Sequence, residues 1–191
     1  MKYLEQMILS KGKVLPGNIL KVDSFLNTQI DIELMKELGK DIYAHFKDCG
    51  VTKILTVEAS GIGIACITAQ FFNCNVVFAK KSRTKNMGDC GVYSADCYSF
   101  THKNMNTLIV NNEFISPSDT VLIIDDFLAN GEACKALMSI VSQAKAKLAG
   151  IAIEIEKGFQ GAGDELRKQG VDLYSLAVID KMEDGKIVFR S

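Results

Sequence analysis

The stretch that decides the fold of this chain is residues 121–133, which read Val-Leu-Ile-Ile-Asp-Asp-Phe-Leu-Ala-Asn-Gly-Glu-Ala. Its first four residues are apolar and three of them are β-branched, which is typical of a parallel strand buried on both faces. Two adjacent carboxylates end this run, and a turn that closes with Asn130 and Gly131 follows. From Glu132 the apolar residues recur at helical spacing. The stretch therefore predicts a strand, an acidic pair, a turn and a helix N-terminus.

Each part of this stretch suits one part of a phosphorylated sugar. Ligands of open α/β sheets gather beyond the carboxyl ends of the strands, and the free N–H groups of a helix N-terminus bind phosphate. The small residues Ala129 and Gly131 allow a phosphate to approach the backbone closely. The carboxylates of Asp125 and Asp126 can accept hydrogen bonds from vicinal hydroxyls or oppose a developing positive charge. The sequence thus predicts a 5-phosphoribosyl site, and the alternative is an ordinary strand-to-helix loop with a helix N-cap.

The stretch 121–133 resembles the phosphoribosyl-pyrophosphate-binding motif of the type I phosphoribosyltransferases. Its wording is close to the branch of that family that acts on xanthine. This resemblance implies that Asp125 and Asp126 are catalytic, through the ribose hydroxyls and the transition-state charge. It also implies that the following residues bind the 5′-phosphate, namely Ala129, Asn130, Gly131, Glu132 and Ala133.

The composition points to one folded domain. The chain has 191 residues, of which 48% are hydrophobic and only two are proline, so it can bury a sizeable core. Its formal net charge of -1 and pI near 6.1 argue against nucleic acid as the main partner. Residues 1–5 lack the apolar segment of a signal peptide, and we expect a cytoplasmic protein with no membrane partner. Its cysteines and histidines lack metal-ligand spacing, so no protein metal site is predicted.

The alternation of strand and helix patterns over roughly residues 50–156 predicts an α/β fold with a mostly parallel sheet flanked by helices. We expect strands over 19–22, 54–57, 76–79, 92–100, 106–110, 121–124, 150–156, 171–178 and 187–189. We expect helices over 1–11, 31–49, 64–72 and from 132, with turns or loops at 14–17, 24–29, 59–63 and 157–163. The resemblance implies a single phosphoribosyltransferase domain, 1–191, with a small hood formed by about residues 1–30 and 157–191 that holds the base.

A second anion-binding turn is predicted at Glu58-Ala59-Ser60-Gly61-Ile62-Gly63, between a strand and a helix. It resembles the pyrophosphate loop of the family, with Ser60 where adenine-specific relatives tend to carry an arginine. We therefore expect Ser60 and Gly61 to bind phosphoribosyl pyrophosphate. The alternative interpretation is a glycine-rich turn that binds no ligand.

Four cations, Lys80, Lys81, Arg83 and Lys85, lie close together before a stretch with little to bury. Charge runs of this kind are usually solvated surface. A departing pyrophosphate would instead be stabilised by them, and the family uses such a loop as a lid, often with a basic residue from the partner subunit. We assign Lys81 to the binding of phosphoribosyl pyrophosphate.

The base is expected to meet Lys157, which follows a strand in Ile-Glu-Lys-Gly-Phe-Gln. An ammonium donates to a purine carbonyl but cannot accept from an exocyclic amine, which favours an oxopurine. Phe159 is placed to stack on the ring. The resemblance adds Leu20 and Asn27 of the hood as purine contacts. The alternatives are an exposed lysine, a core phenylalanine and, for Asn27, a turn residue.

The motif also departs from its relatives. Ala129 stands where hypoxanthine-guanine enzymes carry an aspartate proposed to handle a proton, and an acidic purine such as xanthine depends less on that help. Many relatives have hydroxyl residues where this chain has Asn130 and Ala133, which leaves more of the phosphate binding to backbone amides. Glu132 is expected to point away from the phosphate. We expect Mg²⁺ to arrive with the pyrophosphate substrate and to need no dedicated protein cage.

These observations predict a purine salvage enzyme that converts xanthine and phosphoribosyl pyrophosphate to xanthosine 5′-monophosphate and pyrophosphate. One alternative is hypoxanthine or guanine as the preferred base. Another is a regulator that binds the phosphoribosyl ligand without turnover, although such proteins usually carry a basic DNA-binding appendage that this chain lacks. The resemblance also implies a homodimer.

Overall fold

A computed structural model describes residues 3–82, 91–99, 104–183 and 185–190. At its centre lies a six-stranded sheet with the strand order β10-β9-β8-β7-β3-β4, in which only β10 runs antiparallel to its neighbour. The bounds of these strands are β3 Lys53–Val57, β4 Asn75–Ala79, β7 Thr120–Leu128, β8 Lys147–Lys157, β9 Leu173–Glu183 and β10 Lys186–Phe189. The predicted α/β fold with a mostly parallel sheet is therefore confirmed.

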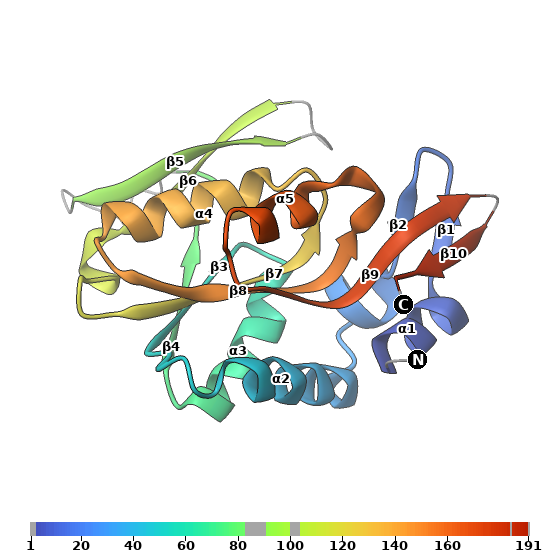
Figure 1. Cartoon of the computed structure of the whole chain (residues 1–191), viewed down its shortest axis with the longest axis horizontal. Helices are drawn as coiled ribbons and strands as arrows, with labels where there is room; N and C mark the ends of the chain where they lie inside the picture. The colour runs from blue at the N-terminus through green and yellow to red at the C-terminus, as the bar shows by residue number, and fades with distance from the viewer. Residues whose placement is uncertain (1–2, 83–90, 100–103, 184, 191) are drawn as a thin grey trace.

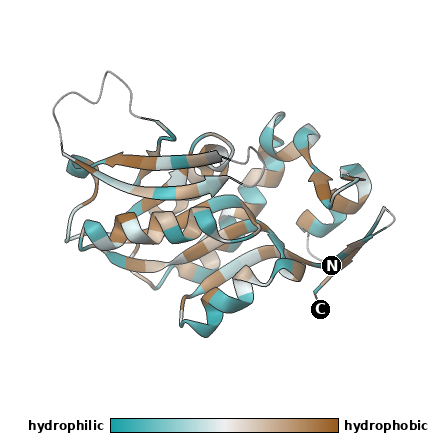
Figure 2. Cartoon of the chain, turned by 90° about the horizontal axis from the view of Figure 1, so that it is seen from above, coloured by the Kyte–Doolittle hydropathy of each residue, from teal (hydrophilic) through white to brown (hydrophobic). Residues whose placement is uncertain are grey.

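Helices cover both faces of this sheet (Figure 1). Helices α2 (Ile32–Phe46) and α3 (Gly61–Phe72) lie on one face, and α4 (Glu132–Gln143) and α5 (Ala162–Lys168) on the other. The start of α2 is capped by Asp31, whose carboxylate accepts a hydrogen bond from the Leu34 N–H at 3.2 Å. The helices carry both hydrophobic and hydrophilic residues, as Figure 2 shows, which matches their position between core and solvent.

Strands β5 (Val92–Ser99) and β6 (Asn104–Asn111) form a separate antiparallel hairpin rather than part of the main sheet. In Figure 1 this hairpin lies over α4. The Gln143 side chain joins the two elements, accepting from the Ser94 N–H at 3.2 Å and donating to the Ser94 carbonyl at 2.9 Å. The two strands were predicted, but their separation from the main sheet was not.

The N-terminal segment contains α1 (Tyr3–Lys11), the hairpin of β1 (Lys13–Leu15) and β2 (Ile19–Lys21), and a π-helix, Asp23–Asn27. It lies beside β9 and β10, so both ends of the described chain are at the same end of the molecule (Figure 1). Two predictions here were wrong: residues 14–15 belong to a strand rather than to a turn, and the expected loop at 24–29 is largely helical. The predicted helix 1–11 and strand 19–22 are confirmed within one or two residues.

The α/β alternation continues beyond residue 156, where the sequence placed its end. Strand β9 pairs in parallel with β8, from Ile151 with Leu173 to Lys157 with Ile179, and α5 connects the two strands. Part of the region 157–191 thus belongs to the main sheet. Only its far end, where β9 pairs with β10, extends beside the N-terminal hairpin, and a hood made of these pieces remains a proposal.

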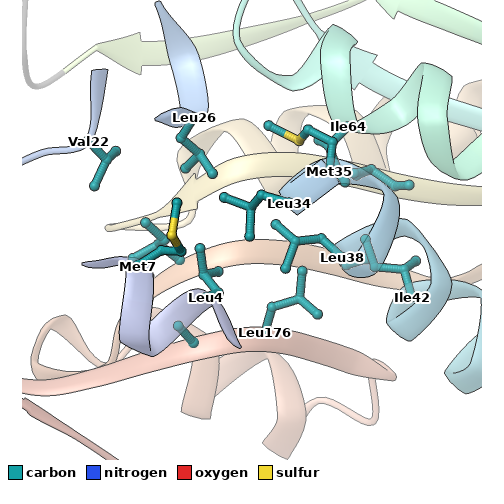
Figure 3. Close-up of a cluster of buried hydrophobic side chains, with 14 of the residues drawn as sticks. Leu4, Met7, Val22, Leu26, Leu34, Met35, Leu38, Ile42, Ile64 and Leu176 are labelled. Carbon is teal, nitrogen blue, oxygen red and sulfur yellow. The ribbon is translucent and has the colours of Figure 1, made fainter. Parts of the chain in front are cut away.

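Two hydrophobic clusters hold the sheet to its helices. The first joins the sheet to α2, α3 and the N-terminal segment, and Figure 3 shows its central side chains, among them Leu4, Leu26, Leu38 and Leu176. The second joins the other face to α4 and the β5–β6 hairpin. The N-terminal segment is therefore packed onto the sheet by apolar contacts that begin in α1. None of the described helices is both long and apolar enough to cross a membrane.

Candidate active site

A cavity of about 250 Å³ lies beyond the carboxyl ends of β3 and β7 and beside the N-terminus of α4. Parallel strands end at this edge, where ligands of α/β proteins bind. The cavity is lined by ten of the residues that the sequence predicted for the site, namely Ser60, Gly61, Lys81, Asp125, Asp126, Ala129, Asn130, Gly131, Glu132 and Ala133. Residues 60 and 131 are far apart in sequence, and the sheet brings them together.

One wall of this cavity is the turn that precedes α4. Gly131 has a φ of 79°, a left-handed conformation that a residue with a side chain rarely adopts, and it occupies the N-cap position of the helix. The Glu132 carboxylate accepts a hydrogen bond from the Lys135 ammonium at 3.1 Å, and this ion pair offsets part of the negative charge of Glu132 beside the turn. The first-turn N–H groups of α4 and the helix dipole make this wall suitable for a phosphate.

The acidic pair forms the floor of the cavity. Strand β7 continues through both aspartates to Leu128, so the prediction that the acids end the strand was wrong. Pairing with β8 extends to this point, with Asp125 opposite Ile153 and Leu128 opposite Glu156. This pairing holds the acids on regular backbone instead of on a loop.

Asp125 is the more deeply buried of the two aspartates. Asp125 is 7% exposed and accepts a hydrogen bond from the Asp126 N–H at 3.1 Å, while Asp126 accepts from the Phe127 N–H at 2.9 Å. Burial raises the pKa of the Asp125 carboxyl well above 3.8, the charge of Asp126 raises it further, and the charge of Lys81 partly opposes both. The raised pKa favours the protonated form of Asp125, and a positive charge close to it favours the ionised form.

The turn at 58–61 forms a second wall. A Cβ atom on Gly61 would lie 2.2 Å from Thr56 Oγ1 and 3.2 Å from Asp125 Oδ1, so a residue with a side chain does not fit there. The Glu58 carboxylate accepts a hydrogen bond from the Lys81 N–H at 2.7 Å, which ties the turn to the end of β4. The Glu58–Ala59 peptide bond is cis. Of the basic run, Arg83 and Lys85 lie outside the described residues.

The hairpin contributes lining residues that the sequence did not reveal. Cys97 and Tyr98 of β5 and Asn106 and Leu108 of β6 border the same cavity. Nothing in the local pattern of these strands distinguishes a lining residue from any other strand residue. Their position depends on the packing of the hairpin over α4, which is tertiary information.

The residues predicted to bind the base lie outside this cavity. Lys157 ends β8, and its ammonium lies 6.0 Å from the centre of the Phe127 ring, which does line the cavity. The same ammonium donates to the Asn18 carbonyl at 3.1 Å, in the turn between β1 and β2. Burial lowers the pKa of Lys157. This lysine therefore connects the N-terminal hairpin to the edge of the cavity.

The other residues predicted to contact the base lie on three different elements. Leu20 lies on β2 and is buried in the first hydrophobic cluster, while Asn27 is half-buried at the end of the π-helix. Phe159 lies in a short 3₁₀-helix, Gly158–Gln160, and is 37% exposed. The alternative that Phe159 is a core residue is excluded by this exposure. Its ring is free to meet a ligand.

Comparison with known proteins agrees with this geometry. Residues 21–172 match the family described as the phosphoribosyl transferase domain, which is most of the chain. This chain belongs to the phosphoribosyl transferase family. Two curated relatives of this phosphoribosyl transferase are named xanthine phosphoribosyltransferase. The one from Ruminiclostridium cellulolyticum is 51% identical over 99% of both chains. The one from Lachnoclostridium phytofermentans is 53% identical over 100% of this chain and 98% of its own.

Solved structures with a similar fold are more distant in sequence. The adenine phosphoribosyltransferase of Trypanosoma brucei, in complex with AMP, pyrophosphate and ribose-5-phosphate, has a TM-score of 0.75 at 18% identity. The alignment covers 92% of this phosphoribosyl transferase and 79% of that chain. The adenine phosphoribosyltransferase from Saccharomyces cerevisiae has a TM-score of 0.71 at 18% identity, over 91% and 98% of the two chains. These similarities establish the fold.

Proposed function

We propose that this phosphoribosyl transferase converts xanthine and phosphoribosyl pyrophosphate to xanthosine 5′-monophosphate and pyrophosphate. The observation that carries the proposal is the single cavity in which a helix N-terminus, an acidic pair and a second glycine turn face one another. A phosphate, a ribose and a pyrophosphate can each be bound by one of these three features. The two relatives named xanthine phosphoribosyltransferase, at 51% and 53% identity, support xanthine as the base.

The reaction is a displacement at C1 of the ribose. A purine nitrogen attacks, pyrophosphate leaves, and the sugar carries positive oxocarbenium character between these events. In our proposal Asp125 and Asp126 on the floor of the cavity stabilise this charge, because a positive charge favours the ionised form of a carboxyl, and they hold the ribose hydroxyls. The turn 129–133 binds the 5′-phosphate, while Ser60, Gly61 and Lys81 bind the pyrophosphate, which needs donors and cations as its charge develops.

Base selection is assigned to Lys157, with Phe159, Leu20 and Asn27 around the ring. The Lys157 ammonium donates to a carbonyl, that of Asn18. An oxopurine carbonyl is a chemically equivalent acceptor, whereas the amino group of adenine is not. Asn27 can serve the second carbonyl of xanthine through its amide.

Mg²⁺ is proposed to enter with the pyrophosphate as part of the substrate. Within the part of the chain that the structure describes, no three His, Cys, Asp or Glu side chains converge to hold a metal ion. The carboxylates of Asp125 and Asp126 line the cavity and are among those available to a substrate-bound ion. This donor set fits an ion held mainly by substrate oxygens, which offsets charge on the leaving pyrophosphate.

Subunit association is also part of the proposal. Strand β4 is an edge strand, and Phe78 on it and Phe114 nearby are exposed beside a groove of about 570 Å³. Exposed aromatic residues along a groove support a subunit contact, and we propose that the protein is a homodimer. We also propose that it is located in the cytoplasm. Sedimentation of the purified protein measures the oligomeric state, and a monomer at micromolar concentration would contradict the dimer.

The decisive experiment is pyrophosphate release from phosphoribosyl pyrophosphate with xanthine, hypoxanthine, guanine and adenine in turn. We expect xanthine to give the highest kcat/KM, because its two carbonyls match Lys157 and Asn27. A higher kcat/KM with hypoxanthine or guanine would show that this base, and not xanthine, is the preferred substrate. No release with any base would leave a binding protein without turnover.

In the active protein, the double change Asp125→Asn and Asp126→Asn should reduce kcat at least about 100-fold by removing the charge beneath the ribose.

A further inference from the structure

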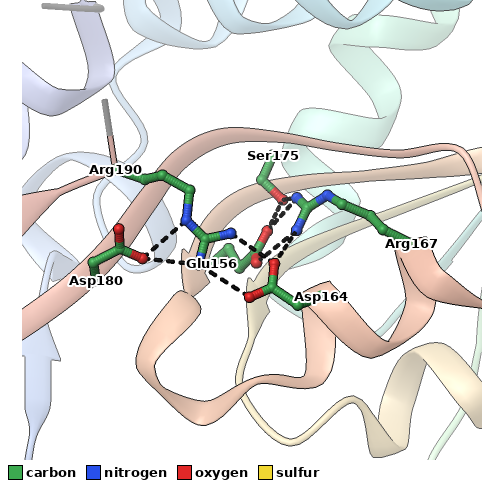
Figure 4. A network of polar contacts seen from close by, with 6 residues as sticks. All are labelled: Glu156, Asp164, Arg167, Ser175, Asp180 and Arg190. Atoms are coloured by element: carbon green, nitrogen blue, oxygen red, sulfur yellow. Dashed lines mark hydrogen bonds and ion pairs between the residues drawn. The ribbon is translucent and has the colours of Figure 1, made fainter.

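Six polar side chains form a continuous network, which Figure 4 shows, and part of it packs against Gly158 in the predicted base-binding segment. Its inner half is centred on Glu156, which is 1% exposed. Both carboxylate oxygens of Glu156 accept from Arg167, at 3.0 and 2.6 Å, and one of them also accepts from the buried Ser175 hydroxyl. A bidentate pair of this kind fixes the direction of both side chains.

The outer half of the network is centred on Arg190, near the end of the chain. Its guanidinium donates to both oxygens of Asp164, at 2.7 and 3.2 Å, and to Asp180 at 2.9 Å. Asp164 lies on α5 and Asp180 on β9, so Arg190 joins two different elements. The Arg190 N–H also donates to the Val178 carbonyl at 2.8 Å, which fixes its backbone to β9.

The backbone between the two halves passes directly against these groups. A Cβ atom on Gly158 would lie 2.8 Å from Asp180 Oδ1 and 2.9 Å from an Arg190 nitrogen, so the Arg190–Asp180 pair covers this glycine closely. Gly163 is as tightly confined on the inner side, where a Cβ atom would lie 2.1 Å from Glu156 Oε1. At both positions the network lies too close to the main chain for a residue with a side chain.

Lys157 occupies the single position between these two anchors. The residue before it, Glu156, is held by Arg167, and the residue after it, Gly158, is covered by Arg190. Beyond Gly158 the 3₁₀-helix carries Phe159. The network therefore fixes the backbone on both sides of Lys157, and this backbone carries the side chains of Lys157 and Phe159.

We propose that Arg190 is a positioning residue for purine recognition, which acts by holding the 157–160 segment through Asp164 and Asp180. This inference rests on the proposed role of Lys157 in binding the base. Side chains that bind a ligand need support of this kind, because displacement of the main chain by an ångström is enough to weaken a directional contact.

The test measures KM for xanthine and for phosphoribosyl pyrophosphate in the full-length protein with Arg190→Ala. We expect KM for xanthine to rise about tenfold and KM for phosphoribosyl pyrophosphate to change less than about twofold. Arg190→Lys should lie between the two proteins, since an ammonium cannot bridge both carboxylates in the same planar geometry. The matched control is Lys181→Ala, which removes an exposed ion pair with Glu183 on the same strand. It should leave both KM values unchanged.

A double-variant comparison separates positioning from general damage. In a Lys157→Ala background, Arg190→Ala should add less than about twofold to KM for xanthine, because the contact that it positions is already absent. Where turnover is too slow, calorimetric affinity for xanthosine 5′-monophosphate gives the same comparison. Equal effects of Arg190→Ala with and without Lys157, or equal increases in both KM values, would overturn the inference. Failure of the proposed function is distinguishable, since it appears in the unmodified protein as absent xanthine turnover.

Discussion

Glu154 and Glu156 lie two residues apart on strand β8, and each is 1% exposed. Glu156 is bound by the Arg167 guanidinium and the Ser175 hydroxyl, which satisfy both of its oxygens. Both carboxylate oxygens of Glu154 are buried without a hydrogen-bond partner among the described residues. The same side chain on the same strand is thus fully paired in one place and unpaired in the other.

The carboxylate of Glu156 is therefore stabilised by its partners, whereas the carboxyl group of Glu154 is buried without a described group that would stabilise its charge. Burial raises the pKa of Glu154 well above 4.5, and the charges of Asp126 and Asp125 raise it further. A neutral Glu154 limits the charge density next to the acidic floor, but its buried polar atoms still destabilise the folded state. Glu156 is paired with the Arg167 guanidinium, and this buried pair holds the backbone next to Lys157 in place.

The largest effect on stability is expected from Glu156→Ala. Removing one partner of a buried, bidentate pair leaves Arg167 and Ser175 without their acceptor, and we expect the free energy of unfolding to fall by about 3 kcal/mol. Urea denaturation followed by circular dichroism measures this change. A loss below about 1 kcal/mol would mean that solvent satisfies Arg167 and that the two glutamates are energetically alike.

A smaller change of opposite sign is expected from Glu154→Met. Methionine has a similar length, fills the same volume and buries no unpaired oxygen, so the free energy of unfolding at pH 7 should rise by about 2 kcal/mol. The same denaturation experiment applies, with unmodified protein as the reference. Destabilisation by this variant would show that Glu154 has a partner in solution, and the contrast with Glu156 would disappear.

The smallest expected effect is the pH dependence of that gain. Because the pKa of Glu154 is raised on folding, the folded state binds its proton more tightly than the unfolded state does. Its contribution to stability is therefore fully present below pH 4.5 and is lost as the pH rises towards the folded-state pKa. The gain from Glu154→Met should shrink by about 1 kcal/mol from pH 7 to pH 5. Denaturation curves at both values check this, and a gain independent of pH would mean that Glu154 does not titrate in this range.

Much of the proposed phosphoribosyl site was predictable because its parts are local in sequence. An apolar strand, two acids, a glycine turn and a helix N-terminus follow one another within residues 121–133, and short-range geometry decides how they are arranged. The turn at 58–63 was predictable for the same reason. Their convergence on one cavity followed from the rule that parallel strands place their carboxyl ends at one edge.

The hairpin and the network were not predictable in this way. Tyr98 and Asn106 line the cavity only because β5 and β6 leave the main sheet and pack over α4. Arg190 meets Asp164, 26 residues earlier in the chain, through the antiparallel return of β10 along β9. Contacts at such separations depend on the arrangement of the elements, which local patterns do not specify.

By itself, the sequence determined the α/β fold class, the acidic pair and the two glycine-containing turns that line the cavity, since each depends on neighbouring residues with a fixed backbone geometry. Only the tertiary structure decided which buried glutamate acquired a partner. Glu154 and Glu156 are equivalent in the sequence pattern, but α5 places Arg167 against Glu156 and brings no cation to Glu154 among the described residues. The physical reason is that the cost of burying a charge depends on the groups that other elements place around it.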